Sequence, residues 1–158
     1  MKLSSRYDVE APMAEVFAEL VNMDHWERAA MRRGADVARM DQVKTTGTDV
    51  AQGMTWLAKF RYHGKDRTAQ IRIDRQDPPA SLHLTATSAL VDAVLLIDLM
   101  DLSLRRTRLT LGLELRPKTL ASKIYVQSLR LAKARVDRSF QTRISQFVVD
   151  LESRIRKR

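Results

Sequence analysis

Cysteine is absent from this sequence of 158 residues, and glycine, proline and aromatic residues are scarce. The missing cysteines exclude a disulfide framework, a thiolate metal site and a cysteine nucleophile. The five glycines form neither a GxGxxG motif nor a phosphate-binding loop, so nothing supports nucleotide binding. His25, His63 and His83 lack the spacing of metal ligands, and we therefore expect no metal and no other cofactor.

Long apolar segments are missing as well. The longest strongly apolar run, residues 93–97, ends at Asp98 and is far shorter than the roughly 20 residues that cross a bilayer. The first residues lack the apolar core of a signal peptide. We therefore expect a cytoplasmic protein. Its length and its 44% hydrophobic content predict one globular domain over residues 1–158.

Positive charge is concentrated near the C-terminus. The chain has a net charge of +9, and residues 119–158 alone hold ten basic and three acidic side chains. Such a segment suggests nucleic acid or anionic lipid as a partner. However, Lys123, Arg135, Arg138 and Arg143 project in different directions on a helical wheel, which favours a solvated surface. We expect no specific nucleic acid, and contact with an anionic membrane remains an alternative.

The N-terminal third predicts one strand and two short helices. Residues 1–10 alternate between apolar and polar side chains, as a half-buried strand does. A short helix is predicted over residues 14–21. A second one is predicted over residues 25–33, with Asp24 as its N-cap and Gly34 at its end.

Residues 35–116 predict only strands and turns. A loop is expected over residues 42–53, and a hairpin turn at His63-Gly64-Lys65-Asp66. The predicted strands are centred on residues 35–41, 56–62, 68–74, 81–87, 91–103 and 108–116.

One predicted strand, residues 91–103, is apolar on both faces. Leu95, Ile97 and Leu99 share one face, while Leu96 and Met100, together with Leu102, share the other. Either another element covers the second face or a second subunit does, so a homodimer is one alternative.

The last forty residues contain no glycine or proline and predict a long amphipathic helix. Nine apolar residues recur at steps of three or four, which places them on one face: Tyr125, Leu129, Ala132, Val136, Phe140, Ile144, Phe147, Leu151 and Ile155. An unbroken helix of this length would be about 60 Å long and would overhang a compact domain. We therefore expect a break or kink between Ser128 and Lys133.

This order of elements resembles the START-like superfamily, also called SRPBCC or polyketide cyclase/dehydrase-like, over the whole chain. The matching segments are Tyr7-Asp8-Val9-Glu10-Ala11-Pro12 leading into Val16-Phe17, Gly64-Lys65, Asp77-Pro78-Pro79 and Leu113-Glu114-Leu115-Arg116-Pro117. The resemblance implies an α+β helix-grip fold, in which about seven antiparallel strands curve around the C-terminal helix and enclose an apolar cavity. Its members bind or carry lipids, steroids and polyketides, and some catalyse cyclisation or dehydration.

Residues predicted to line the cavity come from the sheet, the short helices and the long helix. They are Tyr7, Phe17, Trp26, Trp56, Phe60, Tyr62, Ile71, Leu84, Leu111, Val136, Phe140 and Phe147. The polar candidates are Ser5, Tyr7, Tyr62 and Arg143, and we identify no catalytic set among them.

The leading hypothesis is therefore binding or carriage of a hydrophobic small molecule such as a lipid, a polyketide or an aromatic compound. One alternative is a cyclase or dehydratase. Another is an interaction protein whose basic C-terminal helix contacts an anionic membrane or a client protein.

Overall fold

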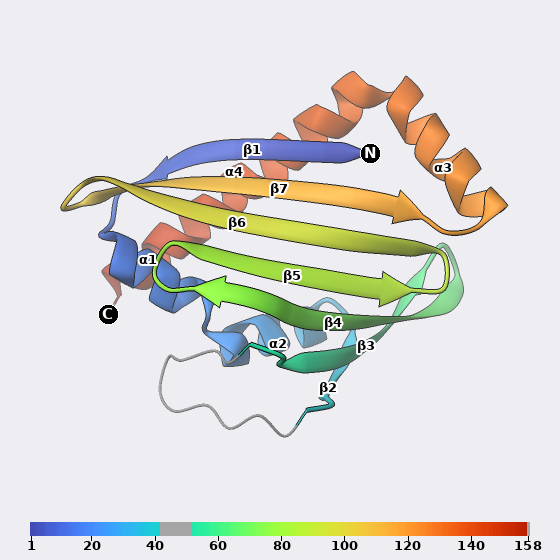
Figure 1. Cartoon of the computed structure of the whole chain (residues 1–158), viewed down its shortest axis with the longest axis horizontal. Helices are drawn as coiled ribbons and strands as arrows, with labels where there is room; N and C mark the ends of the chain where they lie inside the picture. Colours follow the sequence, from blue (N-terminus) through green and yellow to red (C-terminus); the bar gives the residue numbers. More distant parts are fainter. Residues whose placement is uncertain (42–51, 158) are drawn as a thin grey trace.

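A single sheet of seven antiparallel strands, in the order β1-β7-β6-β5-β4-β3-β2, forms the frame of the protein (Figure 1). The structure is a computed structural model and describes residues 1–41 and 52–157, so most of the loop expected over residues 42–53 lies outside it. The strands are β1 Lys2–Val9, β2 Asp36–Arg39, β3 Thr55–Tyr62, β4 Lys65–Asp77, β5 Ser81–Ser88, β6 Val91–Ser103 and β7 Arg106–Pro117. The helices are α1 Met13–Leu20, α2 Met23–Arg32, α3 Leu120–Leu131 and α4 Lys133–Arg156.

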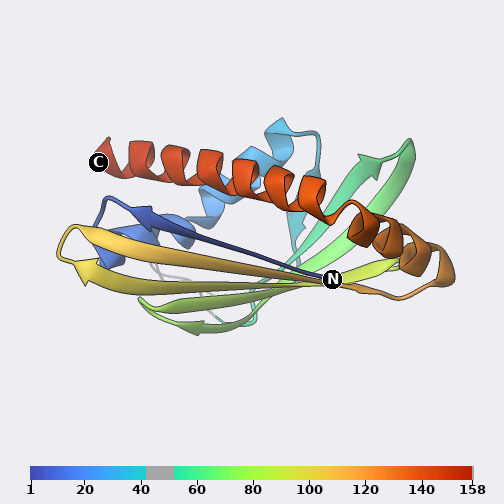
Figure 2. The ribbon, with the colours of Figure 1, turned by 90° about the horizontal axis from the view of Figure 1, so that it is seen from above.

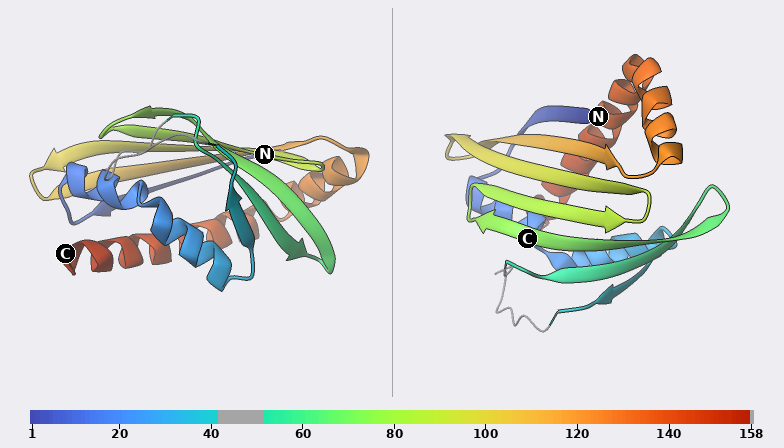
Figure 3. Two further views of the ribbon diagram at one scale, coloured as in Figure 1. Left: turned by 90° about the horizontal axis from the view of Figure 1, so that it is seen from below. Right: turned by 45° about the vertical axis from the view of Figure 1, so that its right-hand side comes forward.

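The helices α1, α2 and α4 lie on one face of the sheet, which curves around them (Figures 2 and 3). The strand β1 pairs with β7, and this pairing places the first strand of the chain beside the last one. The predicted helix-grip fold class is confirmed: a curved antiparallel sheet holds a long C-terminal helix, and two short helices follow the first strand.

The core lies between the sheet and α1 and α4. Its fully buried apolar side chains come from five different elements, namely Val9 of β1, Val16 of α1, Ile73 of β4, Leu109 of β7 and Leu151 of α4. The period-two patterns of the strands predicted these faces, because every second residue of a strand points to the same side. A two-residue turn joins β3 to β4, and its residues His63 and Gly64 have φ of 52° and 75°. These values fit the type I′ turn that joins twisted strands.

The predicted break in the C-terminal helix is confirmed at Ala132. This residue has φ −104° and ψ 31°, and it separates α3 from α4, which run in different directions (Figures 1 and 2). The nine predicted apolar residues therefore do not form one continuous stripe, since the break changes the helical phase. Tyr125 is 44% exposed, and Val126 is buried next to it.

The predicted N-cap of the second short helix was wrong. Asn22, not Asp24, precedes α2, and its side-chain oxygen accepts a hydrogen bond from the His25 backbone N–H at 3.3 Å. Asp24 lies in the first turn of the helix, where a carboxylate favours the positive end of the helix dipole.

The outer face of β6 is open to solvent. Leu96, Met100 and Leu102 are 38%, 53% and 39% exposed, so no element in the described part of the chain covers them. None of the helices within residues 1–41 and 52–157 combines the length and the apolar character needed to cross a membrane.

Candidate ligand-binding cavity

A cavity of about 370 Å³ lies between the curved sheet, α2 and α4. Every residue of its lining except Glu27 is apolar or a tryptophan. The lining consists of Leu20, Met23, Trp26, Glu27, Ala30, Val37, Trp56, Ile71, Leu82, Leu84, Leu95, Ile97, Leu111, Ile144 and Phe147. A volume near 370 Å³ lies within the range of about 300–1,000 Å³ that is usual for small-molecule sites.

Trp26 of α2 joins the helices on the cavity wall. Its ring stacks on Phe147 of α4 with a centroid distance of 5.4 Å and an interplanar angle of 27°. Its indole N–H donates to the Leu20 carbonyl at 2.8 Å, and the Arg154 guanidinium lies 5.8 Å from its ring centroid. The polar edge of this indole is therefore satisfied, and an aromatic surface faces the cavity.

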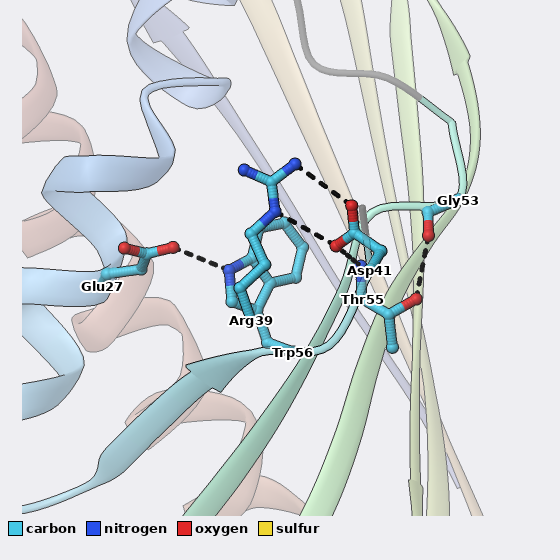
Figure 4. Close-up of polar contacts among 6 residues, drawn as sticks. All are labelled: Glu27, Arg39, Asp41, Gly53, Thr55 and Trp56. Carbon is cyan, nitrogen blue, oxygen red and sulfur yellow. Dashed lines mark hydrogen bonds and ion pairs between the residues drawn. The ribbon is translucent and has the colours of Figure 1, made fainter. Parts of the chain in front are cut away.

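Trp56 of β3 is hydrogen-bonded to the single carboxylate of the lining. Its indole N–H donates to Glu27 Oε1 of α2 at 2.8 Å, as Figure 4 shows. Both tryptophans thus direct their N–H groups to protein acceptors and not to the interior. Since burying an unpaired donor costs free energy, these bonds leave an apolar interior that suits an apolar ligand.

An ion pair supports β2 and β3 beside Trp56. Arg39 is paired with Trp56 in the register of β2 and β3, and its guanidinium makes two contacts of 3.1 Å with the Asp41 carboxylate (Figure 4). Asp41 Oδ1 also accepts the Thr55 backbone N–H at 2.9 Å. The hydrogen bond to Asp41 raises the pKa of Arg39 above its usual value. This network fixes the start of β3, and with it the position of Trp56.

A second, buried ion pair ties α1 to α4. The Glu19 side chain is 4% exposed, and its Oε2 lies 3.0 Å from Nε of Arg154. His25 lies beside this pair, with its ring 5.3 Å from that of Trp26. Burial lowers the pKa of His25, and the positive charge of Arg154 lowers it further.

Polar groups of β1 are used to hold α4. Ser5 Oγ donates to Gln141 Oε1 at 2.7 Å, and the Tyr7 hydroxyl donates to the Gln141 carbonyl at 3.0 Å. Both residues had been candidates for polar groups inside the cavity. The structure gives them a different role, since they connect β1 to the C-terminal helix.

The described residues contain no cluster of His, Asp and Glu able to hold a metal ion. His63 lies in the turn between β3 and β4, and His83 of β5 is paired with Leu96 of β6. Neither lines the cavity.

Half of the residues predicted to line the cavity do so. The structure brings together Trp26, Trp56, Ile71, Leu84, Leu111 and Phe147. The sequence interpretation missed Leu20, Met23, Glu27, Ala30, Val37, Leu82, Leu95, Ile97 and Ile144. Met23, Trp26, Glu27 and Ala30 stand at positions i, i+3, i+4 and i+7 of one helical face, and this spacing in the predicted helix was the available signal.

The other predicted residues lie elsewhere. Phe17 is 8% exposed and belongs to the packed hydrophobic core, while the Tyr7 hydroxyl is hydrogen-bonded to Gln141. Val136 and Phe140 are half-buried on α4 and are absent from the cavity lining, since the lining uses the next turns of the helix, at Ile144 and Phe147.

Phe60 and Tyr62 line a separate, more polar depression of about 580 Å³ between the β3–β4 turn, the β5–β6 turn and α3. There the hydroxyls of Tyr62 and Tyr125 lie 2.8 Å apart, and this hydrogen bond raises the pKa of Tyr62. Both residues do share the strand face of Trp56, as predicted. However, β3 carries them past the end of the apolar cavity.

No known family model and no curated protein sequence matches the chain. Its fold, in contrast, matches solved structures over nearly its whole length. The Zhui aromatase/cyclase from a Streptomyces species has 16% identity and a TM-score of 0.67, with 98% of this chain and 95% of that chain covered.

Two further structures show the same fold. A conserved protein from Geobacillus kaustophilus has 16% identity and a TM-score of 0.64, with coverage of 99% of this chain and 96% of that one. Ara h 8.0201 has 11% identity and a TM-score of 0.60, with coverage of 100% and 99%. The chain therefore shares the helix-grip fold of these structures, as its sequence predicted. At these identities the similarity shows the fold alone, because function depends on the residues of a site.

Proposed function

We propose that the protein binds a compact hydrophobic small molecule in the cavity between the sheet, α2 and α4. The observation that carries the proposal is the composition of the cavity wall, in which Glu27 is the single ionisable side chain among the described lining residues. Burial of apolar surface would drive binding, since both tryptophan N–H groups already have protein acceptors. The proposed contact residues are Trp26, Trp56, Ile71, Leu84, Leu111 and Phe147.

Binding or carriage is favoured over catalysis by the same wall. A cyclase or dehydratase needs an acid and a base, or several polar groups, placed around its substrate. Glu27 is the one candidate in the described lining, and its Oε1 already accepts the Trp56 indole N–H. The aromatase/cyclase named above supports an apolar ligand as a class, and it does not transfer its reaction to this chain.

The proposal is tested with the uncharged fluorescent probe N-phenyl-1-naphthylamine. We expect stoichiometric binding that increases the emission of the probe and quenches tryptophan emission, because Trp26 and Trp56 both line the cavity. The affinity should change little as salt is raised, since apolar burial is not screened by ions.

A matched pair of variants on α2 makes the test specific. Ala30 lines the cavity, so Ala30→Phe should fill it and weaken probe binding by about tenfold or more, whereas Ala29→Phe on the same helix lies outside the lining. Mass spectrometry of molecules extracted from the purified protein would then identify a natural ligand. A wild-type protein that fails to bind the probe, or an Ala30→Phe variant that binds it normally, would refute the proposal.

A further inference from the structure

The outward face of α3 carries a row of exposed aliphatic side chains. Leu120, Ile124 and Leu131 are 76%, 64% and 84% exposed. At about 100° per residue, the three side chains lie within about 40° of one another on the helix. Large apolar side chains gathered in this way on a surface usually mark an interaction site.

The rest of α3 fixes this row in its outward direction. Ser122 and Val126, on the opposite side of the helix, are buried, and the Tyr125 hydroxyl contacts that of Tyr62 at 2.8 Å. At the N-terminus, Thr119 and Ser122 form a reciprocal capping box. The helix extends along one end of the molecule, at an angle to α4 (Figures 1 and 3). The exposed row therefore belongs to an ordered helix and not to a frayed end.

The segment that carries the row has positive side chains and no negative ones. Residues 118–136 contain five basic side chains and no acidic one. Lys123 and Arg130 flank the row on one side, about 60–80° from Leu120 on the helical wheel, and neither has an ion-pair partner among the described residues. Lys118 and Lys133 lie nearby and pair with Asp92 and Asp137.

We propose that α3 docks on the surface of an anionic lipid bilayer. Its leucine and isoleucine side chains would enter the boundary between headgroups and acyl chains, while Lys123 and Arg130 would reach the lipid phosphates. The phosphates of a nucleic acid could pair with Lys123 and Arg130, but a nucleic acid would leave the aliphatic row exposed to water. A convex, narrow row with cations along its side fits a deformable lipid surface better than a preformed protein groove.

The open face of β6 provides a contrast within the same molecule. Leu96, Met100 and Leu102 are exposed there too, but Asp98 projects from the same side of the strand. A carboxylate in the middle of the row opposes contact with anionic lipid. The proposal therefore applies to α3 and not to exposed apolar residues in general, and it does not depend on a ligand in the cavity.

The test is sedimentation of the full chain with vesicles. We expect binding to phosphatidylcholine vesicles that contain about one-third phosphatidylserine, and binding at least about tenfold weaker to phosphatidylcholine alone. Raising the salt from about 0.05 M to about 0.5 M should weaken binding strongly, because the Debye length falls several-fold. Lys123→Gln combined with Arg130→Gln should lower the affinity for the anionic vesicles by about tenfold.

Two triple variants separate apolar docking from simple charge attraction. The first triple variant, Leu120→Ser, Ile124→Ser and Leu131→Ser, removes the row from α3. We expect it to lose vesicle binding by at least about tenfold with unchanged circular dichroism. The second triple variant, Leu96→Ser, Met100→Ser and Leu102→Ser, removes as many exposed apolar residues from β6. It should leave binding unchanged at protein concentrations at which the wild type is a monomer. Wild-type protein that stays free of the anionic vesicles, or an α3 variant that binds them as the wild type does, would overturn the proposal.

Discussion

Arg154 holds the buried carboxylate of Glu19, and this pair connects the first helix of the chain to the last. Glu19 is 3% exposed and lies 3.0 Å from the guanidinium. In Arg154→Met the carboxylate would stay buried and lose this cation. Breaking one side of a buried pair leaves a poorly solvated charge, so we expect a loss of about 3 kcal/mol in the free energy of unfolding, measured by urea denaturation.

Arg156 provides the control for this variant on the same helix. It lies 3.9 Å from Glu152, and its side chain is 69% exposed. Because exposed ion pairs contribute little, Arg156→Met should change the stability by less than about 0.5 kcal/mol. Equal losses of unfolding free energy in the two variants would show that water reaches the Glu19 carboxylate. The buried pair would then stabilise the fold no more than an exposed pair does.

His25 makes the stability depend on pH. Burial and the charge of Arg154 lower its pKa in the folded protein, whereas the unfolded value is about 6.5. Between these two values the unfolded chain binds more protons, so the free energy of unfolding falls as the pH drops below about 6.5. We expect the loss between about pH 7.5 and pH 5.5 to be smaller in His25→Gln. Parallel pH curves for the two proteins, or an NMR titration with an ordinary pKa, would contradict this.

At the scale of elements, α4 is held mainly by its C-terminal half. Leu151 is fully buried in the core, whereas Phe140 is half-buried and belongs neither to the core cluster nor to the cavity lining. Leu151→Ala should therefore lower the free energy of unfolding by about 2–4 kcal/mol, and Phe140→Ala by only about 1 kcal/mol. Denaturant melts of both variants give the comparison. A larger loss for Phe140→Ala than for Leu151→Ala would mean that the N-terminal half of α4 contributes more to core packing than the C-terminal half does.

Periodicity predicted which face of each element is buried, but not how far along the element the cavity reaches. Trp56, Phe60 and Tyr62 do share one face of β3, yet only Trp56 lines the cavity. A period of two identifies a side of the sheet and contains no information on its curvature. The break at Ala132 was predictable because an unbroken helix would exceed the size of the domain.

The polar part of the site could not be predicted for a different reason. Gln141 binds Ser5 and Tyr7 across more than 130 positions of sequence, and Glu27 binds Trp56 across 29. Such partners depend on the register of the sheet and on the position of α2 over it, which local patterns do not contain. The amphipathic spacing of α2 itself was visible, and it would have identified Met23 and Ala30.

At the scale of the whole molecule, the exposed outer face of β6 raises the question of assembly. The sequence left two alternatives for its apolar residues, and the described part of the chain provides no covering element. Leu96, Met100 and Leu102 remain exposed, and Leu104, in the turn after the strand, is 91% exposed. We propose that a second copy covers this strip, since a two-fold dimer pairs one apolar patch with the same patch of its partner. The strip is small for a stable interface, which predicts a weak dimer.

The dimer is tested with Met100→Lys. This side chain is 53% exposed in the monomer, so the variant should keep the unfolding free energy of the isolated monomer within about 0.5 kcal/mol. Light scattering should show that the mass of the wild type rises with concentration toward that of a dimer, while Met100→Lys remains a monomer, because two lysines would meet in an apolar contact. The α3 variant with Leu120→Ser, Ile124→Ser and Leu131→Ser should dimerise as the wild type does, since its changes lie on another surface. A wild type that stays monomeric at every concentration would contradict the dimer and show that the outer face of β6 is exposed in solution. Loss of dimerisation in the α3 variant would instead place the interface on α3.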